Sequence, residues 1–203
     1  EIYTLSLHDA LPIFDYLTSI IIPNSVTHIG DHTFSNCRGL TSVSIPNSVS
    51  TIEEYTFNHC SSLISVSIPS NVTTIEEYAF WKCTDLTSII IPNGVTTIKH
   101  CSFYECGSLS SVIIPNSIKS IGDGAFCGCS SLASITIPGS VTSIGNEAFS
   151  SCSSLATIIV ENGNSVYDSR DNCNAIIEKS TNILIAGCKN STIPSSVTSI
   201  GRF

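Results

Sequence analysis

The chain repeats a single 23-residue pattern along most of its length. Leucine, proline, phenylalanine and cysteine each return at this interval over six consecutive units. The recurring leucines are Leu17, Leu40, Leu63, Leu86, Leu109, Leu132 and Leu155. A fixed period of this length is typical of a solenoid, in which each unit contacts only its neighbours. The period also favours an extended binding surface over an enzyme.

Each unit is predicted to begin with a strand. Val66 and Ile68 alternate with serines in residues 63–70, and this period of two is expected of a half-buried strand. Pro69 ends the strand because proline has no N–H group to donate to a sheet.

The second half of the unit is predicted to turn back toward the next leucine. Val72 and Ile75 point inward from a second short extended segment or turn. Ala79, Phe80 and Cys83 follow at a spacing that predicts one or two helical turns. Because one unit supplies only about six inward apolar groups, it cannot offset the entropy lost on ordering its own residues. The units must therefore stack, with parallel strands about 4.8 Å apart.

Residues 40–62 read LTSVSIPNSVSTIEEYTFNHCSS, and this pattern resembles the BspA-like bacterial surface-antigen class of leucine-rich repeats. The resemblance extends over residues 17–154 in full register. It implies a β-rich leucine-rich-repeat solenoid with short helical turns, six 23-residue repeats, one irregular repeat, and a parallel strand sheet on the concave face. It also implies an extracellular or cell-surface protein that recognises other molecules and has no catalytic residues in the repeat.

The pattern breaks after Leu155, and residues 155–193 are predicted to form an irregular repeat. Glu161 begins a polar connector where proline is expected, and the next Ile-Pro pair comes only at residues 193–194. Apolar residues on both sides of Ser180 and Thr181 predict a β-hairpin within this insertion. The hairpin is expected to place Ile177 opposite Leu184, Ala175 opposite Ala186, and Cys173 opposite Cys188.

Both ends of the chain depart from the pattern. Residues 1–16 match no column of the repeat. Residues 1–14 resemble the translated read-through of a sequencing adapter, and the alternative is a divergent N-terminal capping segment. The pattern stops at Phe203 in the middle of a unit, and the chain contains no methionine. We therefore expect a fragment with one leucine-rich-repeat domain at residues 17–203, truncated at its C-terminus.

The charge of the chain argues against two classes of partner. The 16 acidic residues outnumber the 8 basic ones, and no segment is rich in lysine or arginine. Nucleic acid and anionic membranes both require such basic segments. No apolar run is long enough to span a bilayer, and residues 1–16 lack the features of a secretory signal peptide.

Six of the ten cysteines form a column: Cys37, Cys60, Cys83, Cys106, Cys129 and Cys152. The spacing of stacked units is wider than a disulfide prefers, so buried thiols are expected here. Cys101 and Cys127 lie outside the column and are expected to be partly exposed or to fill a local gap. Cys173 and Cys188 are a candidate disulfide if the compartment is oxidising, and the alternative is two more core thiols.

No catalytic, cofactor or metal site is predicted. The five histidines share no ligand spacing, and the cysteines form no C-x-x-C pair. Adjacent glutamates recur at residues 53–54 and 76–77, and a solvated acidic turn explains them better than an acid–base dyad.

The outward side of the strands is the predicted partner-binding face. One of its columns contains Ile21, Ser44, Ser67, Ile90, Ile113, Thr136 and Ile159. Ile90 and Ile113 are adjacent and should form an exposed apolar patch, which is typical of a contact site. The alternative is that β-branched residues simply favour strands. Trp81, on the opposite side, is expected to pack over a neighbour.

These observations favour a non-enzymatic binding or adhesion domain that contacts a protein or a glycan. The alternative is a structural spacer that presents another domain. Any catalytic activity is expected to belong to a separate domain.

Overall fold

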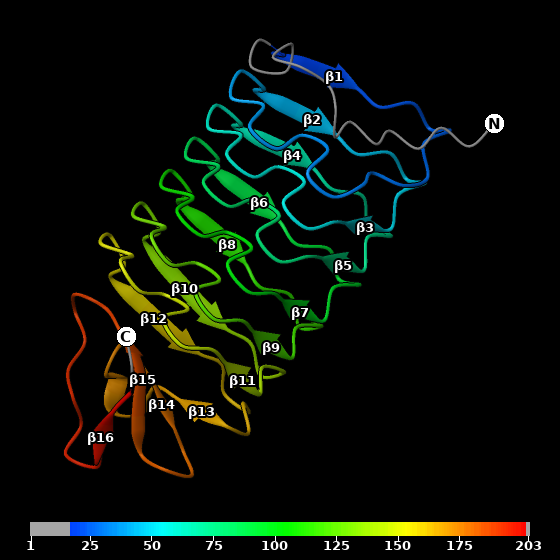
Figure 1. Cartoon of the computed structure of the whole chain (residues 1–203). Helices are drawn as coiled ribbons and strands as arrows, with labels where there is room; N and C mark the ends of the chain where they lie inside the picture. The colour runs from blue at the N-terminus through cyan, green and yellow to red at the C-terminus, as the bar shows by residue number, and fades with distance from the viewer. Residues whose placement is uncertain (1–16, 202–203) are drawn as a thin grey trace.

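The computed structural model describes residues 17–201, so the predicted N-terminal segment lies outside the described residues. The chain winds into a stack of similar units, and the first strands of successive units lie side by side (Figure 1). They pair in parallel with a register of one repeat, as in Ser19 with Ser42 and Ser42 with Ser65. These strands are β1 (Ser19–Ile21), β2 (Ser42–Ser44), β4 (Ser65–Ser67), β6 (Ser88–Ile90), β8 (Ser111–Ile113), β10 (Ser134–Ile137) and β12 (Thr157–Val160).

A second row of parallel strands forms another side of the stack (Figure 1). Its isoleucines point inward, and Ile52 and Ile75 pair directly. The strands are β3 (Thr51–Ile52), β5 (Thr74–Ile75), β7 (Thr97–Ile98), β9 (Ser120–Ile121) and β11 (Ser143–Ile144). The predicted solenoid with parallel strands is therefore confirmed.

The third side consists of turns, and the helical turns predicted there are wrong. We call residues 31–37, 54–60, 77–83, 100–106, 123–129 and 146–152 the turn wall. The Phe57 N–H donates to the Ala79 carbonyl of the next unit at 2.8 Å, whereas the Asn58 N–H donates locally to Tyr55 at 3.1 Å. Tyr55 and His59 have φ values of 55° and 58°.

Left-handed backbone at two positions in each wall segment explains why no helix forms there. It turns alternate N–H groups away from their own unit and toward the next one, so a continuous helical ladder cannot form. Within residues 17–201 the structure has one short helical segment, the 3₁₀ turn η2 (Arg170–Asn172).

A column of phenylalanine rings fills the interior. Six rings stack from Phe34 to Phe149, with centroids 5.3 to 5.8 Å apart. The cysteine column lies beside them, and each thiol from Cys60 onward donates to a phenylalanine carbonyl of an earlier unit, as Cys83 does to Phe57 at 3.0 Å. The column residues therefore connect successive units as well as filling space.

The irregular unit adds a four-stranded sheet to the end of the stack (Figure 1). Its strands are β13 (Tyr167–Asp168), β14 (Ala175–Glu178), β15 (Ile183–Gly187) and β16 (Ser199–Ile200). The hairpin β14–β15 is antiparallel as predicted, and Ile177 pairs with Leu184.

The remaining predicted hairpin pairs are wrong. Ala175 pairs with Gly187, and Ala186 pairs with Ile176, because the register shifts between Ile176 and Ile177. A shift of one residue moves side chains to the opposite face of a strand. Ala175 consequently packs in a small separate cluster, whereas Ala186 joins the main core.

The phenylalanine column should give position-dependent losses of stability. Phe103 stacks on a ring at each side, so Phe103→Ala is expected to lower the free energy of unfolding by about 3–5 kcal/mol. Phe149 stacks only on Phe126, so Phe149→Ala should cost roughly 1 kcal/mol less. Equilibrium unfolding in urea measures both, and equal losses would contradict the stacking argument.

The left-handed wall positions should favour glycine. Ser151 has a φ of 59° and an exposed side chain, so Ser151→Gly is expected to raise the free energy of unfolding by about 0.5 kcal/mol. Ser154 is also exposed but is not among the positive-φ residues, so Ser154→Gly should lower stability by about 0.5–1 kcal/mol. Thermal unfolding of the two variants compares the signs, and a loss in both would contradict this account.

Candidate functional site

The outward column of the first strands forms one continuous exposed face, which we call the strand face. All seven predicted residues are solvent-exposed: Ile21, Ser44, Ser67, Ile90, Ile113, Thr136 and Ile159. Ile90 and Ile113 pair directly across β6 and β8, and their exposed fractions are 78% and 77%. The structure therefore brings together the two isoleucines predicted to form an apolar patch.

Burial on the inner side of the same strands holds the strand face in place. Ile89 and Ile91 flank Ile90 and are both 4% exposed. Side chains along each strand point alternately to the core and to solvent, so packing of the inward side chains fixes the backbone that carries the outward ones. Ile64, which is half exposed just before β4, is a further apolar residue near this face that the column analysis did not single out.

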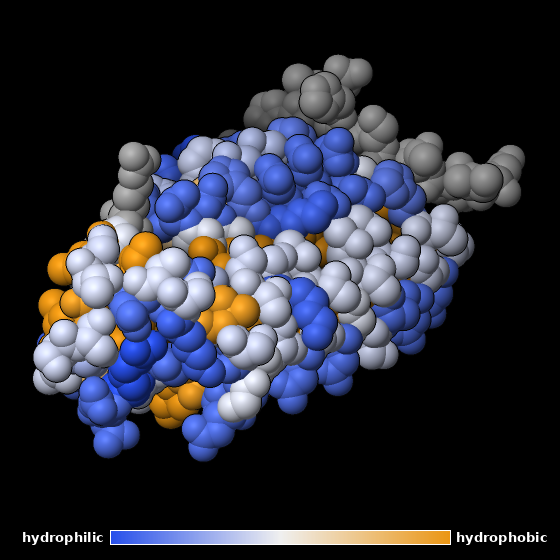
Figure 2. Space-filling view, turned by 90° about the horizontal axis from the view of Figure 1, so that it is seen from below, coloured by the Kyte–Doolittle hydropathy of each residue, from blue (hydrophilic) through white to orange (hydrophobic). Residues whose placement is uncertain are grey.

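Figure 2 shows the molecule from below the view of Figure 1, and most of the surface on this side is hydrophilic. The hydrophobic residues on it gather toward the end that carries the irregular unit. Ile193 and Ile200, which belong to that end, are 59% and 54% exposed.

An aromatic ridge runs along the turn wall, and the sequence analysis recognised only one of its members. Tyr55 stacks on Tyr78 with ring centroids 4.7 Å apart, and Trp81 lies 5.6 Å from Tyr78 and 5.1 Å from His59. The prediction that Trp81 packs over its neighbours is confirmed. Aligning the equivalent positions of successive wall segments would have revealed the tyrosine pair. The ring faces are largely occupied by one another, so we do not regard the ridge as a stacking platform for a ligand.

The recurring glutamates lie beside the turn wall and are engaged in contacts between units. Glu76 forms an ion pair with Lys99 of the next unit at 2.6 Å. Glu53 lies 3.7 Å from His28 of the preceding unit, and partial burial raises the pKa of Glu53. The arrangement fits a structural role for these carboxylates.

Cys173 and Cys188, the candidate disulfide pair, are both free thiols in this structure. Cys173 packs in the small cluster with Ala175 and Ile177, whereas Cys188 packs against the main core. The register shift in the hairpin separates the two side chains in this way. No disulfide joins any of the ten cysteines, which all lie within residues 17–201.

The other cysteines are buried. Burial raises the pKa of Cys106 and Cys152 to about 12. Cys101 and Cys127 are 8% and 7% exposed, so the expectation that they are partly exposed is wrong.

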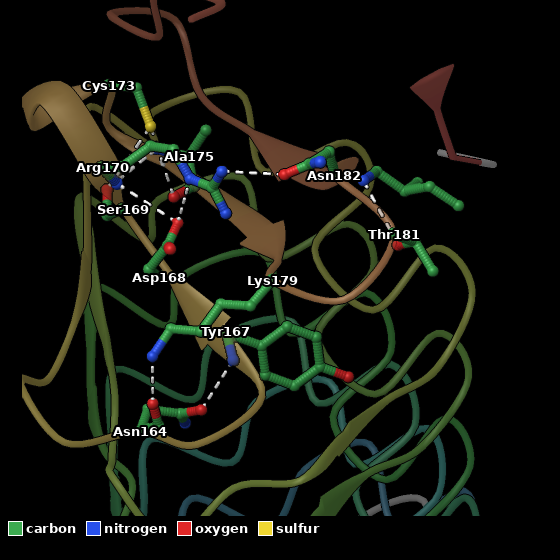
Figure 3. A network of polar contacts seen from close by, with 11 residues as sticks. Asn164, Tyr167, Asp168, Ser169, Arg170, Cys173, Ala175, Lys179, Thr181 and Asn182 are labelled. Carbon is green, nitrogen blue, oxygen red and sulfur yellow. Dashed lines mark hydrogen bonds and ion pairs between the residues drawn. The ribbon is translucent and has the colours of Figure 1, made fainter. Parts of the chain in front are cut away.

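Polar side chains in the irregular unit form a network that fastens it to the stack (Figure 3). Asn164 is buried, and its side-chain amide donates to the carbonyls of Pro138 and Val141 at 2.8 and 2.9 Å. Its Oδ1 accepts the N–H groups of Val166 and Tyr167. The predicted polar connector therefore acts as an anchor.

A second part of the network spans the hairpin. The Arg170 guanidinium donates to Asp168 and to the side-chain oxygen of Asn182, each at 2.8 Å (Figure 3). These groups satisfy one another.

Between residues 17 and 201, no group of three His, Cys, Asp or Glu residues is arranged to hold a metal ion, and no helix there has the length and apolarity needed to cross a membrane.

Comparison with known proteins identifies the repeat. The model of the BspA type leucine-rich repeat region matches residues 14–115 and 85–203, with six copies. No curated protein matches the chain.

Three solved structures resemble this one. A leucine-rich cell surface protein from Faecalibacterium prausnitzii A2-165 is 39% identical with a TM-score of 0.75, over 83% of this chain and 45% of that one. A leucine-rich repeat protein from Bacteroides ovatus is 33% identical with a TM-score of 0.75, over 92% and 46%. The pneumococcal vaccine antigen PcpA shares the fold at 22% identity and a TM-score of 0.69, over 91% and 45%. The chain thus spans under half the length of these proteins.

The thiol column should resist alkylation in the folded protein. Iodoacetamide at pH 8 is expected to label Cys188, which is only partly buried, before any column cysteine. At pH 10 Cys106 and Cys152 should remain unlabelled, because a pKa near 12 keeps both thiols protonated. Mass spectrometry locates the labels, and full labelling in denaturant is the control. If the column cysteines were alkylated as fast as Cys188, the conclusion that their thiols are buried would be wrong.

Proposed function

This chain belongs to the BspA-type leucine-rich repeat family, and we propose that it is a non-enzymatic recognition domain that binds a partner protein through its strand face. We further propose that it works outside a bacterial cell. Support for this location comes from the relatives, one of which is named a leucine-rich cell surface protein.

The single observation that carries the proposal is the exposure of Ile90 and Ile113 on adjacent strands. An isoleucine exposed to this extent gains nothing from the core, and paired apolar side chains on a rigid sheet favour association with another protein. Recognition of a sugar relies on aromatic platforms and dense polar groups. The strand face carries hydroxyl groups but no aromatic residue in its outward columns, so a protein partner fits it better than a glycan.

The alternative role as a spacer rests on the continuity of the stack. The phenylalanine column runs through all six units, and the first strands of neighbouring units pair in parallel within the groups β1-β2-β4, β6-β8 and β10-β12. A spacer needs no particular outward residues, so substitutions on the strand face distinguish the two roles.

The double variant Ile90→Asp with Ile113→Asp tests the binding role. Beads coated with the protein are applied to cultured epithelial cells, and the variant is expected to lower adhesion at least about tenfold, because two apolar contacts are replaced by desolvated charges. Thermal unfolding should stay near that of the parent protein, since both side chains are exposed.

A matched control separates the loss of apolar contact from the gain of charge. Ser44→Asp with Ser67→Asp adds the same charges to the same column and should leave most adhesion intact. Pretreating the cells with trypsin should abolish adhesion, whereas glycosidase treatment should not. Unchanged adhesion of the isoleucine variant would favour the spacer role, and loss with glycosidase alone would indicate a glycan.

A further inference from the structure

A small cavity with a basic lining lies where the turn wall leads back to the first strands, and we call it the basic cavity. Its volume is about 240 Å³, and it is lined by Arg38, His59, Ser61, Lys82 and Thr84. Every one of these side chains carries a nitrogen or a hydroxyl group, and the lining contains no carboxylate. In a chain with 16 acidic and 8 basic residues, such a lining indicates a site for an anion.

The repeat explains how these residues come together. The lining consists of two columns of equivalent residues, with His59 and Lys82 in one and Arg38, Ser61 and Thr84 in the other. Stacking places equivalent positions of neighbouring units about 5 Å apart, within reach of one bound group. The next unit has Glu105 and Gly107 at these positions, so the columns do not continue as a basic stripe.

The two permanent cations of the basic cavity are incompletely neutralised. Arg38 is exposed and forms no ion pair with any residue between 17 and 201. The Lys82 ammonium lies 3.6 Å from a carboxylate oxygen of Glu105, which is too far for a hydrogen bond, and 5.3 Å from the centre of the Trp81 ring. Two cations thus face one carboxylate, and positive charge remains for a further anion.

The titration of His59 reflects the same surroundings. Burial lowers the pKa of His59, the charges of Lys82 and Arg38 lower it further, and the charge of Glu105 raises it. His59 is therefore mostly neutral at pH 7 and offers one ring N–H group as a donor. The Thr84 hydroxyl donates to the Ser61 carbonyl at 3.1 Å, so it is not among the donors that face the cavity.

We propose that the basic cavity binds the phosphate monoester group of a small molecule. Such a group has a charge of about −1.5 to −2 at pH 7 and three terminal oxygens, which match two cations and the neighbouring neutral donors. The guanidinium of Arg38 can donate to two of these oxygens at once. A sulfate ester or a carboxylate carries a single charge and matches the two cations less well.

Size and charge restrict the ligand to a small molecule. The cavity is smaller than the roughly 300–1,000 Å³ of pockets that enclose a whole drug-sized ligand, so it suits one chemical group. A long polyanion would extend beyond these three units and meet a chain whose formal net charge is −8. The basic cavity uses none of the outward strand residues, so it is a site separate from the strand face.

NMR titration of the full chain with methyl phosphate tests the proposal. At pH 7 the backbone amides of His59, Ser61 and Lys82 are expected to shift, with a Kd on the order of 1 mM for so small a ligand. Methyl sulfate and acetate should bind at least about threefold more weakly at the same ionic strength, because each carries one charge. Equal affinity for all three probes would indicate a general charge effect and overturn the proposal.

Two glutamine variants that remove the same charge locate the binding. Arg38→Gln is expected to weaken binding of methyl phosphate about tenfold, because it removes a charge-assisted bidentate contact. Lys119→Gln is the matched control, since Lys119 is exposed and lies outside the lining, and it should change the Kd less than about twofold. Thermal unfolding should be unchanged in both variants. Equal weakening in the two would refute the site.

Two further measurements place the anion beside Lys82 and His59. Glu105→Gln removes the carboxylate that competes for Lys82 and should tighten binding about threefold, whereas Glu54→Gln makes the same charge change outside the lining and should not. Saturating methyl phosphate should raise the pKa of His59, followed by its ring protons, because a nearby anion favours the imidazolium. An unchanged pKa, or no tightening in Glu105→Gln, would overturn the proposal. Neither result bears on adhesion through the strand face.

Discussion

Backbone hydrogen bonds between units hold this structure in register, and every side-chain column depends on them. On the strand side the Ile64 N–H donates to the Thr41 carbonyl of the preceding unit. On the turn wall the Phe57 N–H donates to the Ala79 carbonyl of the following unit. Because the strand-side bond recurs from Thr41 to Ala156 and the wall bond recurs from Phe34 to Phe126, equivalent residues are placed directly above one another. The stacked phenylalanines and the buried thiols follow from that placement.

The same constraint decides where function can reside. Residues that face the interior are committed to contacts between units, and the thiols and several glutamates are also engaged there. What remains includes the outward side of the strands and the places where the stacking is interrupted. Ile90 and Ile113 represent the first kind of place, and the irregular unit with its four-stranded sheet represents the second.

Much of this fold could be predicted from the sequence, because a constant repeat length specifies stacking without further detail. The strands, the inward columns and the exposed pair Ile90 and Ile113 all follow from period and alternation. The turn wall could not be predicted in the same way. The spacing of Ala79, Phe80 and Cys83 fits a helix, but the left-handed φ of Tyr78 and Lys82 prevents one.

The irregular unit shows a second limit of sequence reasoning. The hairpin was predictable from its apolar runs, whereas the register shift at Ile176 and Ile177 was not, because both residues are fully buried and apolar on either face. That single shift reverses the expected positions of Ala175 and Cys173.

The alternation along each first strand has a consequence for how such a protein can change over generations. Positions such as Ser44, Ser67 and Ile90 lie outside the interior, so replacing them leaves the stacking columns intact. Selection can therefore alter the recognition surface one repeat at a time while the fold is inherited unchanged. A chain built in this way can acquire a new specificity without first losing its stability.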